Sequence, residues 1–287
     1  MLFIKKYINN DVSFEGLNSF SAILGESPSN GARSPILWNK VYSSEKIKSR
    51  MLPFDVSKEN MIPLLEELNK LPSFLGGAIA VPYKELVAQW CKNNISERAK
   101  KIGAVNCLYK KNGKLFGTNT DGEASLMTFK ERFGNLTSLK ILILGIGGAG
   151  KAVASYFSDY DLTVCSRSLE GQQFAKKIKS KWIPWDELNK NIFDSNVIIN
   201  CTSLGYGKDI ERTPVAPETI ASLKKDTLIF DIIYQPLETK LLKLSKRAGL
   251  KILNGLDMNL QQAVLAFKYS NKNLLSNAKI EEIMSRE

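Results

Sequence analysis

One stretch of the chain, residues 140–154, constrains its fold more than any other. Ile141 to Leu144 form a short apolar run without charges, which is typical of a strand buried on both faces. Gly145, Gly147 and Gly150 follow with the spacing G-x-G-x-x-G. In this spacing the first glycine makes a tight turn, the second lets the backbone approach a phosphate, and the third packs a helix on the strand. The stretch therefore predicts a strand, turn and helix that bind the pyrophosphate of a dinucleotide.

The helix predicted over about 151–157 supports this interpretation. Its free amides and the positive end of its dipole would face the anion. The alternative is a tight turn that binds nothing, which is as good an explanation when the glycine motif stands alone. The strand before the motif and the helix after it favour the binding site.

The next strand of the unit predicts which dinucleotide binds. This strand covers 162–165, and Ser166, Arg167 and Ser168 follow it. NAD enzymes place a carboxylate here to bind the ribose 2′-hydroxyl, and no acid stands at this position. Arg167 instead offers a planar guanidinium to a 2′-phosphate, and the two serines offer hydroxyls. The sequence favours NADP over NAD, with an ordinary surface arginine as the alternative.

Length and hydropathy bound the class of protein. A chain of 287 residues, of which 44% are hydrophobic, is expected to form two globular domains. Its longest stretches without a charge, 71–83 and 195–207, hold 13 residues each, too few to span a bilayer. Asp11 and Glu15 interrupt any apolar core of a signal peptide. We expect a cytoplasmic protein without membrane contact.

Histidine is absent from the sequence, which removes the commonest general acid or base and the commonest metal ligand. Any proton transfer must then use Lys, Asp, Glu, Tyr or Cys. The four cysteines lack C-x-x-C spacing, which indicates reduced thiols and no metal site. They are Cys91, Cys107, Cys165 and Cys201.

The net charge of +11 is compatible with an anionic cofactor, an acidic substrate or nucleic acid. The basic residues are spread along the whole chain, and no aromatic residues alternate with them. A generally lysine-rich composition explains the charge equally well, so we do not predict a nucleic-acid surface.

After Arg167, strands and helices alternate along the chain, which indicates a parallel, doubly wound sheet. The expected strands are 20–25, 51–56, 76–81 (stopped by Pro82), 103–109, 141–144, 162–165, 197–203, 228–231 and 251–253. The expected helices begin near Pro35 or cover about 58–71, 85–91, 122–133, 151–157, 169–180, 237–248 and 257–267.

Lys84 and Asp121 are the candidates for acid–base chemistry. Lys84 stands at a predicted helix start, where the helix dipole disfavours a cation. Asp121 precedes a glycine at another helix start, where an aspartate is commonly only a cap. A solvated lysine and a capping aspartate are the alternatives to an ion-paired acid and base.

With these pieces in order, the chain resembles the shikimate dehydrogenase family from about Phe20 to Phe267. The motifs that carry the resemblance are Val81-Pro-Tyr-Lys-Glu85, Gly103-Ala-Val-Asn106, Asn119-Thr-Asp-Gly122, Gly145-Ile-Gly-Gly-Ala-Gly150, Ser166-Arg-Ser168, Asn200-Cys-Thr-Ser203, Asp231-Ile-Ile-Tyr234 and Gly255-Leu-Asp-Met-Asn-Leu-Gln-Gln262.

The resemblance implies an α/β fold of two domains. Residues 1–120, completed by 254–287, would be the substrate-binding domain, and residues 121–253 a Rossmann-like, doubly wound NADP domain. The substrate cleft would lie between them.

The resemblance also assigns roles to individual residues. Lys84 and Asp121 match the family's catalytic pair, in which the aspartate holds the lysine charged and oriented. The implied substrate-binding residues are Ser34, Asn106, Tyr234 and Gln262. The implied cofactor-binding residues are Gly145, Gly147, Gly148, Gly150, Ser166, Arg167, Ser168, Thr202 and Gly255.

The sequence departs from the family pattern in the expected substrate pocket. The family's Ser-x-Ser-Pro is Ala32-Arg-Ser-Pro35 here, and its Asn-Val-Thr is Ala78-Ile-Ala80. Two hydroxyls and an amide are lost, and Ser29 and Asn30 are candidates to replace them. The residues before Phe20 match no family element.

The resemblance implies an NADP-dependent oxidoreductase of aromatic amino acid biosynthesis that interconverts 3-dehydroshikimate and shikimate. A quinate or other cyclic hydroxy-acid dehydrogenase is the alternative within this class. A non-catalytic NADP-binding regulator is the alternative outside it, and retention of Lys84 and Asp121 speaks against it. The expected partner is a small cyclic hydroxy acid, and the expected assembly is a monomer or a homodimer.

Overall fold

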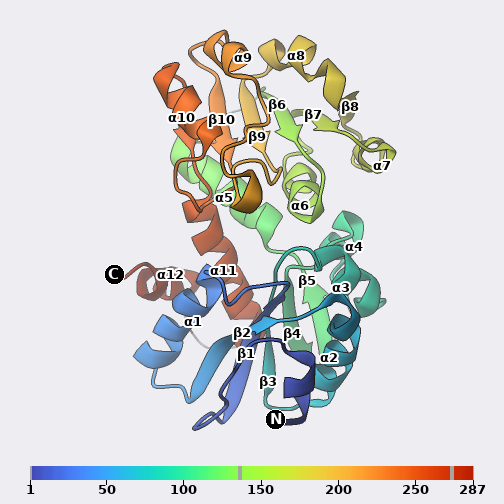
Figure 1. Ribbon diagram of the computed structural model, residues 1–287, viewed down its shortest axis with the longest axis vertical. Coiled ribbons are helices and arrows are strands. Elements are labelled where there is room, and N and C mark those ends of the chain that lie inside the picture. The colour runs from blue at the N-terminus through green and yellow to red at the C-terminus, as the bar shows by residue number, and fades with distance from the viewer. Residues whose placement is uncertain (1, 135–137, 272–274, 287) are drawn as a thin grey trace. The chain divides into compact units, whose positions relative to one another are not determined.

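The computed structural model describes residues 2–134, 138–271 and 275–286 (Figure 1). The chain divides into two compact units. The first unit is Met1–Thr120 with Leu260–Glu287, and the second is Asp121–Asn259.

A mixed five-stranded sheet forms the centre of the first unit. Its order is β2-β1-β3-β4-β5, where β1 is parallel to β2 and β3, while β3, β4 and β5 pair antiparallel. The strands are β1 (Ser19–Gly25), β2 (Ser49–Asp55), β3 (Phe74–Ile79), β4 (Cys107–Lys111) and β5 (Lys114–Thr118).

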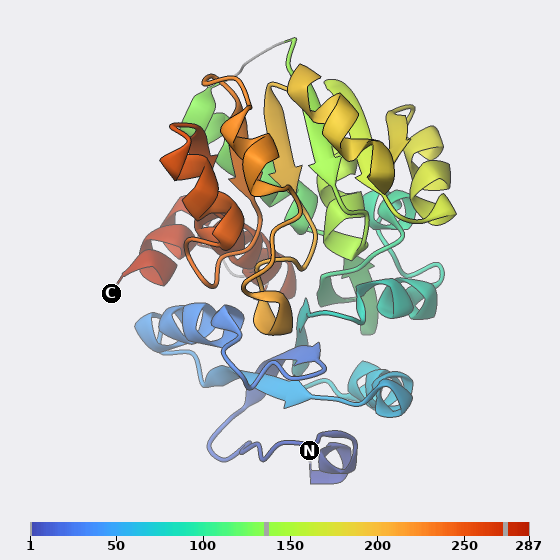
Figure 2. The same ribbon diagram turned by 45° about the horizontal axis from the view of Figure 1, so that its top comes forward.

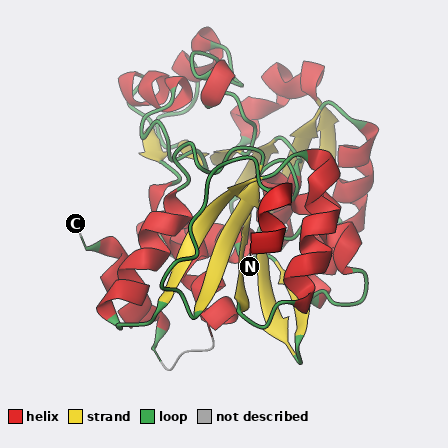
Figure 3. Cartoon of the chain, turned by 60° about the horizontal axis from the view of Figure 1, so that its bottom comes forward, coloured by secondary structure: helices red, strands yellow, loops and turns green. Residues whose placement is uncertain are grey.

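Helices cover both faces of this sheet, as Figure 3 shows. One apolar core lies among the strands, α2 and α3, and a second core joins the strands to α1, α11 and α12. The helices are α1 (Arg33–Ser44), α2 (Lys58–Lys70), α3 (Lys84–Cys91), α4 (Glu97–Ile102), α11 (Leu256–Asn271) and α12 (Asn277–Ser285).

The hairpin of β4 and β5 corrects the sequence prediction. A strand was expected over 103–109 and a polar turn after it, but the strand begins at Cys107 and a second strand follows. Asn112 and Gly113 connect the two with φ of 52° and 77°. Asn-Gly is the usual sequence of such a two-residue hairpin turn, so the signal for β5 was present in the sequence.

The residues before Phe20 belong to the first unit. They form a 3-10 helix, η1 (Leu2–Tyr7), which packs on α2. Ile4, Ile8 and Val12 are buried in the first core. Asn10 donates to the carbonyl of Pro53 at 3.1 Å and accepts from the amide of Asp55 at 2.8 Å. The segment therefore covers the edge of β2.

A six-stranded, wholly parallel sheet forms the second unit, in the order β11-β10-β9-β6-β7-β8 (Figure 2). This order is that of the doubly wound dinucleotide-binding fold, so the predicted fold class is confirmed. The strands are β6 (Lys140–Leu144), β7 (Asp161–Ser166), β8 (Lys181–Pro184), β9 (Val197–Asn200), β10 (Leu228–Asp231) and β11 (Lys251–Leu253).

One helix, α5, leads into this sheet, and further helices and short 3-10 turns connect its parallel strands. They are α5 (Asp121–Phe133), α6 (Gly148–Tyr156), α7 (Leu169–Lys177), η2 (Trp185–Glu187), α8 (Leu188–Asn191), η3 (Ile192–Asp194), η4 (Gly207–Asp209), α9 (Pro217–Ala221) and α10 (Lys240–Arg247). Sequence analysis missed β8, α8 and α9, whose four or five residues are too short to show a periodic pattern. Within the described ranges, the structure contains no helix that is both long and apolar enough to cross a membrane.

Candidate functional site: a dinucleotide turn and a buried amide cluster

The glycine turn follows β6 at the point where the strand order reverses. β6 lies between β7 and β9. On one side the sheet continues from β7 to β8, and on the other side it continues from β9 to β10 and β11. Gly145 has φ of 90°, which L side chains rarely adopt, and its amide donates to the carbonyl of Cys165 at 2.9 Å. A Cβ at Gly150 would lie 2.3 Å from the carbonyl oxygen of Gly145. Only glycines let α6 start this close to the strand.

The N-terminus of α6 is open where a phosphate would approach. Gly147 is the N-cap and Gly148 the first helical residue, and a Cβ on Gly147 would meet nothing within 4 Å. Gly147 has no side chain that could cap the helix amides. The open amides and the helix dipole suit a pyrophosphate, so the turn fits a dinucleotide.

The loop after β7 lies next to this turn, because β6 and β7 are paired from Lys140 to Leu144. Ser166 is buried, and its Oγ accepts from Trp182 Nε1 at 2.9 Å. Ser168 caps α7 by accepting from the amide of Gly171 at 3.3 Å. Arg167 is exposed. The loop backbone is held at both ends, while the guanidinium of Arg167 can reach an anion in solvent.

A buried polar network holds the loop after β9. Asp231, fully buried at the end of β10, accepts from Asn200 Nδ2 at 3.1 Å and from Thr239 Oγ1 at 2.7 Å. Asn200 Oδ1 accepts from the amide and the hydroxyl of Thr202 at 3.0 and 2.7 Å. Burial raises the pKa of Asp231 to about 6. The network fixes Thr202, a predicted cofactor residue, to the ends of two strands.

Tyr234 and Gly255 lie at the end of the same sheet. Tyr234 is partly buried in the segment after β10. The amide of Gly255 donates to the carbonyl of Ile233 at 3.0 Å, and a Cβ on Gly255 would lie 2.0 Å from the carbonyl oxygen of Ile232. The segment before α11 therefore packs directly on the chain leaving β10.

In the first unit, the structure brings together two predicted substrate residues that are far apart in sequence. Asn106 Nδ2 lies 3.5 Å from Gln262 Oε1 and donates to Thr120 Oγ1 at 3.0 Å. Asn106 Oδ1 accepts from the amide of Thr120 at 2.8 Å. The hydroxyl of Thr120 also donates to the carbonyl of Gln262 at 3.2 Å. These side chains form a buried cluster that orients the amides.

The two acid–base candidates both begin helices. Lys84 is the first residue of α3 and is partly buried, and its carbonyl accepts from the amide of Val105 at 2.8 Å. Asp121 is the first residue of α5 and is buried. Ser34 is buried in the first turn of α1.

The three alanines that depart from the family pattern share one environment. Ala78 is buried in β3, opposite Cys107, and Ala32 and Ala80 pack against the same core. That core includes Leu37 of α1. The positions expected to supply polar groups are therefore part of an apolar wall.

Ser29, proposed as a replacement donor, is committed elsewhere. Its amide and hydroxyl donate to the carboxylate of Asp55 at 2.8 and 2.5 Å.

Sequence reasoning missed the roles of Thr120, Asn200 and Asp231 in holding these groups. A signal for two of them was present, because a polar side chain ending an otherwise apolar parallel strand occupies the edge where ligands bind. Asn200 and Asp231 both end such strands. Thr120 gave no comparable signal.

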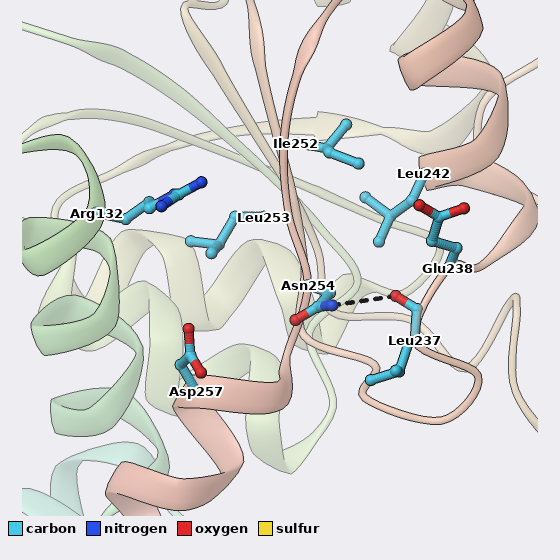
Figure 4. Close-up of a pocket in the computed structure, with 8 residues that line it drawn as sticks. All are labelled: Arg132, Leu237, Glu238, Leu242, Ile252, Leu253, Asn254 and Asp257. Atoms are coloured by element: carbon cyan, nitrogen blue, oxygen red, sulfur yellow. Dashed lines mark hydrogen bonds between the residues drawn. The ribbon is translucent and has the colours of Figure 1, made fainter.

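A pocket of about 280 Å³ lies elsewhere in the second unit (Figure 4). Its lining comes from α5, α10, β11, the first turn of α11 and the segments before α10 and after β11. Asn254 donates to the carbonyl of Leu237 at 3.3 Å. None of its residues belongs to the glycine turn or to the loop of Ser166–Ser168. In the part of the chain that the structure describes, no cluster of His, Cys, Asp and Glu could hold a metal ion.

Two family models match the chain over both units. Residues 23–108 match the "shikimate dehydrogenase substrate binding domain", and residues 128–241 match "shikimate / quinate 5-dehydrogenase". The shikimate dehydrogenase (NADP(+)) of Methanococcus maripaludis is 35% identical over 242 residues, covering 82% of this chain and 85% of its own length.

Solved structures give the same result. The shikimate 5-dehydrogenase of Thermus thermophilus in complex with NADP(H) and shikimate has a TM-score of 0.77 at 26% identity, covering 93% of this chain and 98% of its own. The shikimate dehydrogenase of Aquifex aeolicus has a TM-score of 0.81 at 28% identity, covering 96% and 100%. With a dinucleotide turn and a buried amide cluster of this kind, and relatives of this identity and coverage, the chain belongs to the shikimate dehydrogenase family.

Proposed function

We propose that this chain is an NADP-dependent dehydrogenase that interconverts 3-dehydroshikimate and shikimate. The observation that carries the proposal is the open glycine turn at the strand-order reversal, with Arg167 on the adjacent loop, in a member of this family. The Methanococcus maripaludis relative is named shikimate dehydrogenase (NADP(+)), which agrees with an arginine where NAD enzymes carry an acid.

The chain's own residues supply the cofactor's binding groups. The amides at Gly147 and Gly148 would bind the pyrophosphate, and Arg167 and Ser168 would bind the 2′-phosphate. Thr202 and Gly255, which follow the carboxyl ends of β9 and β11, would contact the rest of the nucleotide. When bound, the nicotinamide supplies the hydride chemistry.

Lys84 is proposed as the proton donor in carbonyl reduction and as the proton acceptor in alcohol oxidation. A lysine in this role offers its ammonium hydrogen to the oxygen on which negative charge develops. The chain has no histidine that could serve instead. Asp121 is proposed to hold the lysine charged and oriented.

Asn106 and Gln262 are proposed to bind hydroxyls of the substrate. Thr120 orients the side-chain amide of Asn106 and holds the main-chain carbonyl of Gln262, and the Gln262 side chain lies 3.5 Å from that of Asn106, so the two are ordered before a substrate arrives. Such preorganisation reduces the entropy lost on binding.

Steady-state kinetics with NADP and shikimate test the proposal, with quinate as the second substrate. Replacing Lys84 by Met removes the donor and keeps most of the side-chain volume. We expect Lys84→Met to lower kcat by a factor of roughly 100 to 10,000 without changing the Kd of NADP. Lys100→Met, at an exposed position in α4, is the matched control and should keep wild-type kcat.

Each other outcome points to a different conclusion. A wild-type kcat in Lys84→Met would mean that Lys84 is a solvated lysine and not the proton donor. A higher kcat/KM for quinate than for shikimate would favour the alternative dehydrogenase, which the second family model also covers. Binding of NADP without turnover of any cyclic hydroxy acid would favour the regulator.

A further inference from the structure

A buried lysine connects the two elements proposed to bind the cofactor. Lys151 is the fourth residue of α6, immediately after the glycine turn, and its side chain is only 8% exposed. Its Nζ lies 2.5 Å from Glu170 Oε1, in the first turn of α7. Glu170 is 64% exposed. The ion pair therefore joins α6, which follows the glycine turn, to α7, which follows the Arg167 loop.

This lysine is costly at its position. Burial disfavours an ammonium group, and the N-terminal turn of a helix disfavours a cation. The neighbours Ala152 and Val153 are fully buried, so an apolar side chain would suit the environment. Its partner Glu170 is largely exposed, so solvent screens the pair and the attraction offsets little of the cost of burying the ammonium group. The cost suggests that the positive charge serves something other than folding.

The position of Glu170 indicates a role for the positive charge of Lys151. The first turn of α7 packs tightly on the glycine turn, since a Cβ on Gly171 would lie 2.0 Å from Ser166 Oγ and 2.9 Å from Ile146 Cγ2. Glu170 thus places a carboxylate beside the loop proposed to bind the 2′-phosphate. An unpaired acid there would repel a phosphate that carries up to two negative charges.

We propose that Lys151 determines the preference for NADP by neutralising Glu170, without itself contacting the 2′-phosphate. The pair keeps Arg167 as the dominant charge of the loop. NAD has no charge at this position, so the state of the pair matters little for its affinity. The inference rests on the proposed use of NADP.

The test is the Kd of NADP and of NAD, measured by calorimetry, with adenosine 2′,5′-bisphosphate and AMP as probes that lack the nicotinamide. Lys151→Met leaves Glu170 unpaired and should weaken NADP and the bisphosphate roughly tenfold, but NAD and AMP less than twofold. The double variant Lys151→Met with Glu170→Gln should restore NADP affinity to within about twofold of wild type. The selective loss should shrink at high salt.

Three further variants keep the test decisive. Lys151→Arg keeps the charge and should behave as wild type. Glu170→Gln alone changes an exposed side chain, so it should fold, and it should tighten NADP severalfold relative to NAD because Lys151 keeps its charge. Arg167→Ala removes the proposed phosphate ligand and should weaken NADP about ten- to hundredfold.

The inference is overturned if Lys151→Met weakens both dinucleotides equally and Glu170→Gln does not restore binding. It is also overturned if Glu170→Gln leaves the NADP to NAD ratio unchanged. A wild-type protein that prefers NAD, or binds neither dinucleotide, would instead overturn the proposed function. The two failures are therefore distinguishable.

Discussion

At the scale of single residues, the proposed substrate pocket differs most from the family pattern. Ala32 and Ala80 stand where hydroxyls are expected, and both pack against an apolar core. A substrate hydroxyl or carboxylate that meets this wall loses water without gaining a partner. We therefore expect a preference for a ligand that is less polar on this side than shikimate.

The double variant Ala32→Ser, Ala80→Thr tests this expectation at two partly buried positions. Each restored hydrogen bond is worth about 1 kcal/mol, so kcat/KM for shikimate should rise roughly tenfold to thirtyfold. Ala221→Ser, exposed in α9, is the control and should change nothing. High wild-type efficiency that the double variant does not improve would falsify the idea and point to other donors. We leave Ala78 unchanged, because an amide there would be buried in the core.

At the scale of elements, the ends of β9 and β10 are held by one buried carboxylate. Burial raises the pKa of Asp231 to about 6 from an ordinary value of 3.8. The native state thus binds this proton more tightly than the unfolded state. The stabilisation that Asp231 gives in its protonated form is complete below about pH 4 and is lost as the pH rises through about 6.

Asp231→Asn removes this titration and keeps the side-chain shape. Between about pH 4 and pH 7, wild type should lose roughly 3 kcal/mol of unfolding free energy relative to the variant. Urea unfolding across this range measures the difference. Asp226→Asn, at an exposed turn, is the control and should run parallel to wild type. Parallel curves for Asp231→Asn would mean that the carboxylate titrates normally in the folded protein.

At the scale of the whole molecule, each unit has its own apolar core and its own proposed ligand. The segment before β1 belongs to the first unit only, where Ile4 is fully buried and Phe3 is 47% exposed. Substitutions at these two adjacent positions can therefore test whether the stability of the first core affects cofactor binding.

Ile4→Ala should lower the free energy of unfolding by about 2 to 4 kcal/mol, because it leaves a cavity in the core. Phe3→Ala should cost much less, and both variants should keep the wild-type Kd of NADP, since the glycine turn is in the second unit. Urea unfolding and calorimetry measure the two quantities. A weaker Kd in Ile4→Ala would show that the first core supports the cofactor site.

Several features of this protein are local enough to be predicted from sequence. The glycine spacing after residues 141–144 predicts the turn, because positive φ and close backbone approach are properties of a few adjacent residues. Alternating apolar runs and amphipathic stretches predict the parallel sheet of the second unit in the same way. The short strands β5 and β8 were not predicted, because the only signal for β5 was its Asn-Gly turn and the sequence of β8 shows no periodicity.

Other features were decided only by the tertiary structure, since they depend on which distant segments pack together. Asn106 and Gln262 are 156 residues apart, and folding places their amides 3.5 Å from one another. In the sequence alone, Lys151 is an ordinary helical lysine. In the folded protein its side chain is buried, and Glu170 of α7 lies beside its ammonium group. The sequence determined the elements through local backbone preferences. Long-range packing determined which polar groups are buried, paired and charged, because burial changes the energy of a charge more than any local pattern does.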